Sequence, residues 1–236
     1  MSSLGQVLKS IGPKLVPFFK TSCIYFVLMA EQPSLLTACI KCLPIISLIM
    51  FVFLHGMSLS KEHTFSRRIV AGLVFSCFGD ALIIWPNLFL GGMAMFAIAQ
   101  IMYISAFGFK PLNPKIGAII FALATIVTYI LMPGLNGVLA IGVPIYISLL
   151  GGMTWRAISQ VQLSKENGMK WTKLCSCIGG ILFLISDTIL GFHHFYHPIP
   201  YSAVSIMLTY YAAQLGIALS TVNSKNNNIN KQVNVK

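Results

Sequence analysis

Residues 72–86 read GLVFSCFGDALIIWP and residues 177–192 read CIGGILFLISDTILGF, and these two stretches decide the fold class. Each is a long apolar run typical of a membrane-spanning helix, and each contains one aspartate, Asp80 or Asp187. An aspartate near the middle of a bilayer costs about 2.5–3.5 kcal/mol on insertion scales, so it is rare without a partner or a function. Two such residues in comparable settings, in a chain with only five acidic residues, predict one shared site.

The composition of the whole chain excludes an ordinary soluble domain. Hydrophobic residues make up 56% and charged residues 9% of the 236 positions, whereas a soluble domain carries roughly 25% charged residues. The length allows about eight spans of roughly 20 residues each, joined by short connections. We therefore predict an all-α, polytopic integral membrane bundle that forms a single domain over residues 1–222. The polar, Asn-rich tail at 223–236 is predicted to be disordered.

The basic residues orient this predicted bundle. We expect spans at about 15–30, 34–54, 69–85, 88–109, 115–132, 135–158, 171–191 and 200–222. Connections that contain Lys or Arg alternate with connections that contain none, which is the positive-inside pattern and places both termini in the cytosol. The net charge of +11 is spread over these span ends. It therefore favours contacts with anionic membrane lipid and argues against nucleic acid as a partner.

Short motifs recur between the two halves of the chain. FGDALI in the third predicted span resembles ISDTIL in the seventh, and AIAQIMYISA in the fourth resembles YAAQLGIALS in the eighth. Four spans followed by four spans of the same orientation would form a parallel 4+4 internal repeat. Such a repeat places a binding site at the interface between its halves.

Three ionisable side chains are predicted to lie at a similar depth. Asp80 and Asp187 fall in the non-cytosolic half of their spans, and Lys41 falls in that half of the second span. A lysine beside one of two buried carboxyl groups separates their titrations, so that one can act as an acid and the other as a carboxylate. Acid–base catalysis needs such a pair. Two alternatives remain, an interhelical bridge without chemistry and a proton relay in a transporter.

Amides and tyrosines accompany these groups in the middle of the spans. Gln100 and Gln214 lie in corresponding spans, with Tyr103, Tyr210 and Tyr211 nearby. Polar side chains at this depth usually bond to one another across helices. We interpret Gln100, Tyr103, Tyr211 and Gln214 either as structural contacts between helices or as residues that line the site.

The histidines and cysteines are the candidate metal ligands of this chain. The segment GFHHFYHPIP contains His193, His194 and His197, but a zinc site needs a converging third or fourth ligand, which the other histidines cannot supply from the opposite face. A loop at the membrane interface explains this segment better. The six cysteines lie in or beside apolar runs and are interpreted as small packing residues. We predict no metal and no cofactor.

Several segments, taken in order, resemble one protein family. They are GPKLVPFFK, IKCLPI, GLVFSCFGDALIIW, MFAIAQIMYISAFG, TWRA, LISD and PYSAVSIMLTYYAAQLGIALS, and they extend from about residue 11 to residue 221. Together they resemble the animal branch of the lysoplasmalogenase family, the YhhN-like proteins also called transmembrane protein 86. The resemblance covers nearly the whole chain, although no single motif is decisive.

The resemblance implies an enzyme, usually of the endoplasmic reticulum, that hydrolyses the vinyl ether bond of lysoplasmalogens. The products are a fatty aldehyde and glycerophosphoethanolamine or glycerophosphocholine. The recurring polar positions of the family correspond to Lys41, Asp80, Tyr103, Asp187, Tyr211 and Gln214. Where relatives often carry a histidine in the fourth span, this chain has Gln100, which cannot titrate. A proton-transfer role for that position is therefore in doubt here.

We expect Asp80 and Asp187 to be the catalytic acid and carboxylate, in an order that the sequence leaves open. Lys41 would adjust the titration of one of them or bind phosphate. The residues that would line the site are Gln100, Tyr103, Tyr211 and Gln214. The expected partners are a lysophospholipid substrate and membrane lipid, and the chain could be a monomer or a homodimer. The alternatives are a non-catalytic lipid- or sterol-binding protein of the same fold and a small proton-coupled transporter.

Overall fold

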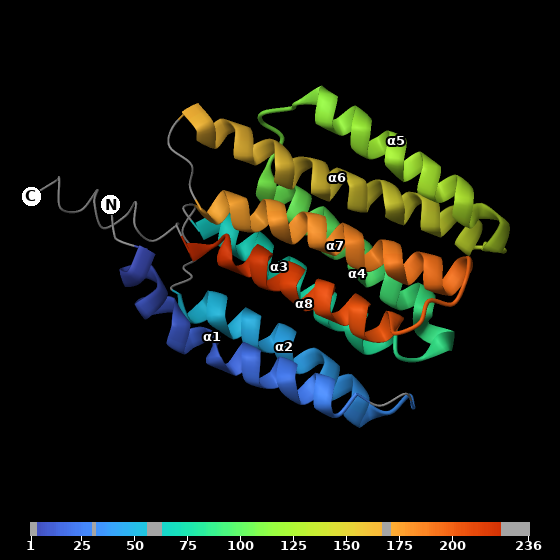
Figure 1. Cartoon of the computed structure of the whole chain (residues 1–236), viewed down its shortest axis with the longest axis horizontal. Coiled ribbons are helices and arrows are strands. Elements are labelled where there is room, and N and C mark those ends of the chain that lie inside the picture. The colour runs from blue at the N-terminus through green and yellow to red at the C-terminus, as the bar shows by residue number, and fades with distance from the viewer. Residues whose placement is uncertain (1–3, 30–31, 56–62, 167–170, 223–236) are drawn as a thin grey trace, which may run out of the picture.

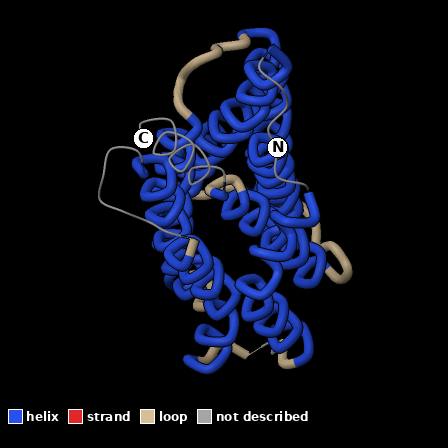
Figure 2. Tube along the Cα trace, turned by 90° about the vertical axis from the view of Figure 1, so that its left-hand side faces the viewer, coloured by secondary structure: helices blue, strands red, loops and turns tan. Residues whose placement is uncertain are grey.

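The computed structural model describes residues 4–29, 32–55, 63–166 and 171–222. Within these ranges the chain forms α-helices and two short 3₁₀ helices and contains no strand (Figures 1 and 2). The helices are α1 (Leu4–Val27), α2 (Leu35–Leu54), α3 (Thr64–Leu82), η2 (Pro86–Leu88), α4 (Phe89–Phe107), α5 (Pro114–Leu131), η3 (Met132–Gly134), α6 (Leu139–Glu166), α7 (Trp171–Phe195) and α8 (Ser202–Leu219). The predicted all-helical bundle is confirmed. The predicted disordered tail at 223–236 lies outside the described residues.

Local sequence signals set several of these helix boundaries. Ser34 is the N-cap of α2, and its side chain accepts a hydrogen bond from the backbone N–H of Thr37 at 3.1 Å. Pro114 opens α5, a position where its missing N–H costs nothing. Both signals place a helix start after a short connection, which keeps neighbouring helices antiparallel.

Six helices in the described part of the chain are long and apolar enough to cross a membrane. They are α2, α4, α5, α6, α7 and α8. The sequence predicted about eight spans, and α1 and α3 do not meet the same standard. α1 carries Lys14 and Lys20, whereas α3 carries Arg67, Arg68 and Asp80, and these charges lower their hydropathy. Both helices nevertheless pack in the same bundle beside α2.

Two predicted boundaries were wrong. α1 was expected at 15–30 but begins at Leu4, and Pro13 and Pro17 lie inside it, because packing against α2 stabilises the helix despite its two prolines. Residues 192–200 were expected to form a loop, but α7 continues to Phe195. No proline interrupts that helix before Pro198, so the last turn of α7 includes residues that the sequence had assigned to the loop.

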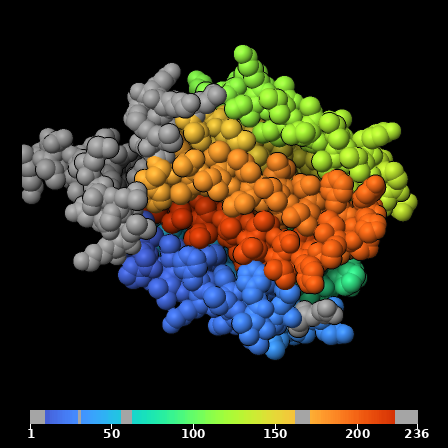
Figure 3. Space-filling model, in the orientation of Figure 1, coloured from blue at the N-terminus to red at the C-terminus, as the bar shows by residue number. Residues whose placement is uncertain are grey.

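The helices form an antiparallel bundle (Figure 1). α1 and α2 lie on one side of the bundle and α5 on the other, and α7 and α8 cross the face between them in Figure 3. α1 begins and α8 ends at the same end of the bundle. The opposite end contains η2, η3 and the connection 196–201, and the described connections there carry no Lys or Arg. We call it the uncharged end.

Glycines allow two helix pairs to pack most closely. A Cβ atom on Gly92 of α4 would lie 3.2 Å from the carbonyl oxygen of Gly79 in α3, and one on Gly216 of α8 would lie 3.1 Å from the Cα atom of Gly179 in α7. Small residues of this kind let helices in membranes approach through their backbones. The α3–α4 and α7–α8 pairs therefore pack backbone against backbone at these glycines. The predicted 4+4 repeat stays a prediction.

Candidate active site

A cavity of ≈ 530 Å³ lies inside the bundle, and both Asp80 and Asp187 line it. Asp80 comes from the last turn of α3, and Asp187 comes from α7 about two turns before that helix ends. The fold therefore brings together the two aspartates that the sequence singled out, from helices far apart in the chain.

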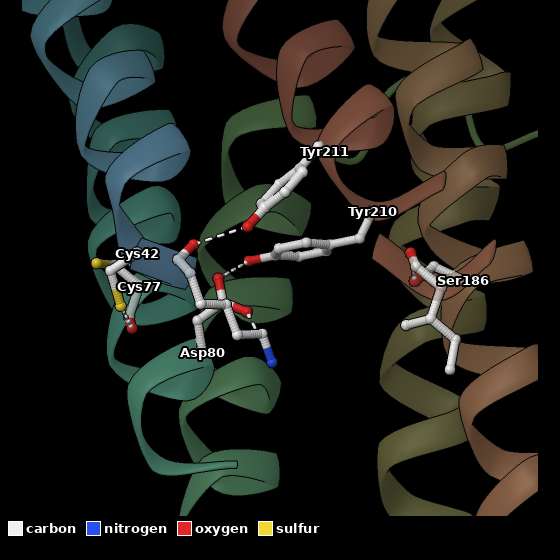
Figure 4. A network of polar contacts seen from close by, with 8 residues as sticks. Cys42, Cys77, Asp80, Ser186, Tyr210 and Tyr211 are labelled. Atoms are coloured by element: carbon white, nitrogen blue, oxygen red, sulfur yellow. Dashed lines mark hydrogen bonds and ion pairs between the residues drawn. The ribbon is translucent and has the colours of Figure 1, made fainter. Parts of the chain in front are cut away.

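Asp80 has a separate partner for each of its oxygens. The Nζ atom of Lys41 in α2 lies 3.7 Å from Oδ1, and the hydroxyl of Tyr210 in α8 donates a hydrogen bond to Oδ2 at 2.5 Å. Figure 4 shows Tyr210 reaching Asp80 across the space between the helices. Because Asp80 is only 1% exposed, these two contacts replace the water that a charged carboxylate would otherwise need.

Asp187 has a different environment from Asp80. It is half-buried, and the hydroxyl of Tyr146 in α6 donates a hydrogen bond to its Oδ2 atom. Among the described residues no Lys or Arg forms an ion pair with Asp187. One carboxyl group of the cavity is thus paired with a cation, and the other is held by a neutral hydroxyl.

From the two aspartates the cavity extends between apolar side chains of α5 and α6. We call this part the apolar arm. Residues spaced for one face of α5 form its first wall, and residues of α6 form its second. The α5 residues are Ile120, Leu123, Ala124, Val127 and Leu131, and the α6 residues are Val143, Ile147, Leu150 and Gly151. Leu123 lines the arm and is also 56% exposed, so the arm reaches the outer surface of the bundle beside α5.

Four of the residues predicted to line the site lie behind the cavity wall. Gln100, Tyr103, Tyr211 and Gln214 are buried, whereas Lys41 lies in the wall itself. The hydroxyl of Tyr211 donates to the backbone carbonyl of Lys41 at 2.9 Å and so fixes the turn of α2 that carries the lysine. These residues support the site from outside the cavity, and their part in any chemistry stays a prediction.

A second buried contact links α4 to α8 one turn away from Asp80. The hydroxyl of Tyr103 donates to Oε1 of Gln214 at 2.8 Å, and the hydroxyl oxygen of Ser76 lies 3.5 Å from the Tyr103 hydroxyl. Gln100 lies beside the hydroxyl of Tyr146, but neither of its amide atoms meets hydrogen-bond geometry. Polar side chains thus connect α3, the helix that carries Asp80, with α4 and α8.

Sequence reasoning missed the tyrosines that contact the two carboxyl groups. Tyr146 was not considered, and Tyr211 was preferred to Tyr210 because of the family pattern. Tyr25 of α1 also lines the cavity and packs edge-on against Tyr211, with ring centroids 5.4 Å apart. A tyrosine in an apolar run looks like any aromatic packing residue. The only available signal was the position of Tyr210, one helical turn before Gln214 on the same face of α8.

The histidine segment contributes to the cavity, which the sequence did not predict. His193 and His194 lie in the last turn of α7 and line the cavity at the uncharged end, together with Phe89 and Phe195. No cluster of three or more His, Cys, Asp or Glu side chains that could hold a metal ion occurs among the described residues. All six cysteines are free thiols.

Comparison with known proteins shows the family of this chain. The model of the YhhN family matches residues 36–221. The chain is 44% identical to "Lysoplasmalogenase TMEM86A" of Bos taurus and 43% identical to the protein of that name in Homo sapiens, each over 95% of both chains. It is 34% identical to "Lysoplasmalogenase TMEM86B" of Sus scrofa, over 91% of this chain and 88% of that one. No solved structure matches at a significant level. By the extent of these matches, the chain belongs to the YhhN family.

Proposed function

We propose that this protein is a membrane hydrolase that cleaves the vinyl ether bond of lysoplasmalogens. The products are a fatty aldehyde and glycerophosphoethanolamine or glycerophosphocholine. The names of its relatives support the activity, and one structural observation carries the proposal for the site. Two carboxyl groups with different partners line a single cavity that continues into an apolar arm. An acid, a carboxylate and room for a lipid chain are what this reaction requires.

The reaction begins with proton transfer to carbon. A carboxylic acid protonates the β-carbon of the vinyl ether, which converts the double bond into a C–H bond and an oxocarbenium ion. Water then adds to the cationic carbon and gives up a proton to the carboxylate that the acid left behind. The hemiacetal breaks its C–O bond to the glycerol, and the aldehyde and the free glycerol hydroxyl result. By analogy, glycosidases use two carboxyl groups to form and stabilise a related oxocarbenium ion.

The contacts of the two aspartates support one assignment of their roles. Lys41 and the Tyr210 hydroxyl both stabilise a negative charge on Asp80, which suits the carboxylate that faces the developing cation. Asp187 has no cationic partner among the described residues, so no ion pair offsets the cost of a charge there. We assign that proton to Asp187. Tyr146 occupies Oδ2, which leaves Oδ1 to carry the proton toward the substrate.

The apolar arm suits the alkenyl chain of the substrate. Its walls come from α5 and α6 and consist of aliphatic side chains, so a hydrocarbon chain can enter it without desolvating polar groups. The five helical steps along α6 from Tyr146 to Gly151 correspond to about 7.5 Å. An alkenyl chain of natural length exceeds this distance. The remainder would leave beside the exposed Leu123 and lie in the surrounding lipid.

The test is aldehyde release by the purified protein from a defined 1-alkenyl lysophospholipid. Asp187→Asn and Asp80→Asn preserve the shape of each side chain and remove its acid–base function. General acid catalysis contributes roughly 10²–10⁴-fold and electrostatic stabilisation of a developing charge about 10²–10³-fold, so each variant should lose at least about 100-fold in kcat. Thermal unfolding in detergent checks that each variant is folded. A folded Asp187→Asn variant with near wild-type activity would remove Asp187 from the mechanism.

The finer statements about location are also proposals. We infer that the protein resides in the endoplasmic reticulum with both termini in the cytosol. The resemblance to the animal lysoplasmalogenase family motivates the location, and the absence of Lys and Arg from the described connections at the uncharged end supports the orientation. Protease accessibility of terminal tags in sealed microsomes tests this orientation, since cytosolic tags are cleaved without detergent.

A further inference from the structure

The opening of the cavity at the uncharged end has its own chemistry. We call this opening the mouth and define it by Phe89, His193, His194, Phe195 and Ser202. It is continuous with the space beside the two aspartates, and His194 is exposed there. No Lys or Arg contributes to it, because Lys41 is the only such residue of the described chain that lines the cavity. The mouth is therefore a polar entrance without a permanent positive charge.

A backbone contact fixes the hydrogen-bonding direction of His193. The backbone N–H of Ile199 donates a hydrogen bond to Nδ1 of His193 at 2.9 Å. Because Nδ1 accepts this bond, the ring proton of the neutral imidazole lies on Nε2. His193 thus offers one N–H donor, in an orientation set by the loop that follows α7.

Spacing along α7 relates the mouth to the chemistry. His193 follows Asp187 by six residues, which is about 9 Å along the helix. In a lysoplasmalogen, seven bonds separate the β-carbon that receives the proton from the phosphorus atom, which is roughly 8–9 Å for an extended chain with bonds of about 1.5 Å. A substrate with its vinyl ether at Asp187 and its chain in the apolar arm would therefore place its phosphate near His193.

We propose that the mouth is the headgroup subsite, in which the Nε2–H group of His193 donates a hydrogen bond to a phosphate oxygen of the lysophospholipid. This inference rests on the proposed function, since it takes the substrate from it. The first residues of α8, Ser202 and Ala203, also line the cavity, and the partial positive charge of a helix N-terminus favours an anion there. Lys41 is a poorer candidate for binding the phosphate, because it forms an ion pair with Asp80 beside the carboxyl groups.

The aromatic rings of the mouth hold His194 in place. The ring of His194 stacks on Phe89 with centroids 4.6 Å apart and an interplanar angle of 3°. Phe195 packs edge-on against both rings, at 5.9 Å from Phe89 and 5.1 Å from His194. These contacts use the faces of the rings for packing between α4 and α7. We therefore assign the recognition of the headgroup to its phosphate and not to its ammonium group.

A binding experiment with an unreactive ligand tests this subsite independently of catalysis. The ligand is a 1-alkyl lysophospholipid, whose saturated ether cannot undergo the reaction, and the reference is the 1-alkylglycerol of the same chain length, which lacks phosphate. His193→Asn places an amide oxygen near the Nδ1 position, so the bond from Ile199 survives while the donor at Nε2 is lost. His193→Gln places its amide near the Nε2 position and keeps a donor for phosphate.

Binding of the lysophospholipid to His193→Asn should weaken about 10-fold to 100-fold, the usual range for a hydrogen bond to a charged group. His193→Gln should bind it close to the wild type, and the 1-alkylglycerol should bind all three proteins equally. The matched control is His197→Ala, because His197 is exposed and outside the cavity wall.

Three results would overturn the proposal. One is unchanged lysophospholipid binding in His193→Asn, and another is equal weakening of both ligands, which would indicate a structural role. Binding of inorganic phosphate as tight as that of the lysophospholipid would assign the mouth to free phosphate instead of a lipid headgroup. A phosphate preference that depends on His193, together with no aldehyde release from the reactive substrate, would reject the proposed hydrolysis and retain the subsite.

Discussion

Each carboxyl group of the cavity depends on one tyrosine hydroxyl, and Tyr146 is the partner of the proposed acid. Tyr146→Phe keeps the ring in α6 but removes the hydrogen bond that holds Asp187 toward the cavity. A hydrogen bond of this kind contributes about 0.5–1.5 kcal/mol, so kcat for aldehyde release should fall about 3-fold to 10-fold with little change in KM. Tyr129→Phe is the control, since Tyr129 is 80% exposed on α5. An equal loss in both variants would contradict the positioning role.

The ion pair between Lys41 and Asp80 predicts that substitutions of these two residues have non-additive effects on the free energy of unfolding. Lys41→Met leaves Asp80 without a cation in a nearly dry environment, and breaking such a buried pair costs roughly 3 kcal/mol of unfolding free energy. The double variant Lys41→Met/Asp80→Asn removes the unpaired charge and should recover most of that stability while remaining inactive. Thermal unfolding in detergent measures the stability of both variants, and aldehyde release measures their activity. If the double variant were no more stable than Lys41→Met, the charge pair would not be the cause.

Packing of whole helices determines whether Asp187 and Tyr210 can reach their partners. α7 carries Asp187, α8 carries Tyr210, and these helices approach most closely at Gly179 and Gly216. A Cβ atom on Gly216 would lie 2.8 Å from the carbonyl oxygen of Cys175, which is backbone and cannot move away independently. Gly216→Ala should therefore push the two helices apart. We expect a lower melting temperature and reduced activity together.

A glycine in an open position provides the control for this helix pair. A Cβ atom on Gly12 of α1 would meet no atom within 4 Å. Gly12→Ala should leave the melting temperature unchanged or raise it slightly, because alanine is the better helix former. A decrease in Gly12→Ala equal to that in Gly216→Ala would show that the close contact between α7 and α8 is not responsible.

For the molecule as a whole, the sequence predicted what depends on composition and local pattern. Asp80 and Asp187 could be found because a charge inside an apolar run is costly and therefore conspicuous. The role of Tyr146 depends on which face of α6 meets α7, and no local pattern encodes that choice. His193 was predicted to lie in a loop, whereas α7 continues past it. The sequence contains no clear signal for the end of this helix before Pro198, so the boundary could not be located. Partners across helices were thus the least predictable part of the site.

The arrangement of the cavity, with the mouth at one end and the apolar arm at the other, predicts how KM depends on the length of the substrate chain. Gly151 lies at the end of the arm farthest from Tyr146 along α6, where an added Cβ atom would approach Ile120 at 3.3 Å. Gly151→Leu should fill this end, so that KM rises for 1-alkenyl substrates with long chains and changes little for chains of about six carbons. Ser148→Leu adds the same side chain to an exposed position on α6 outside the cavity wall and should leave both values unchanged. Because the chain would occupy the arm only if the headgroup lies at the mouth, an equal effect on long and short chains would contradict this orientation of the substrate.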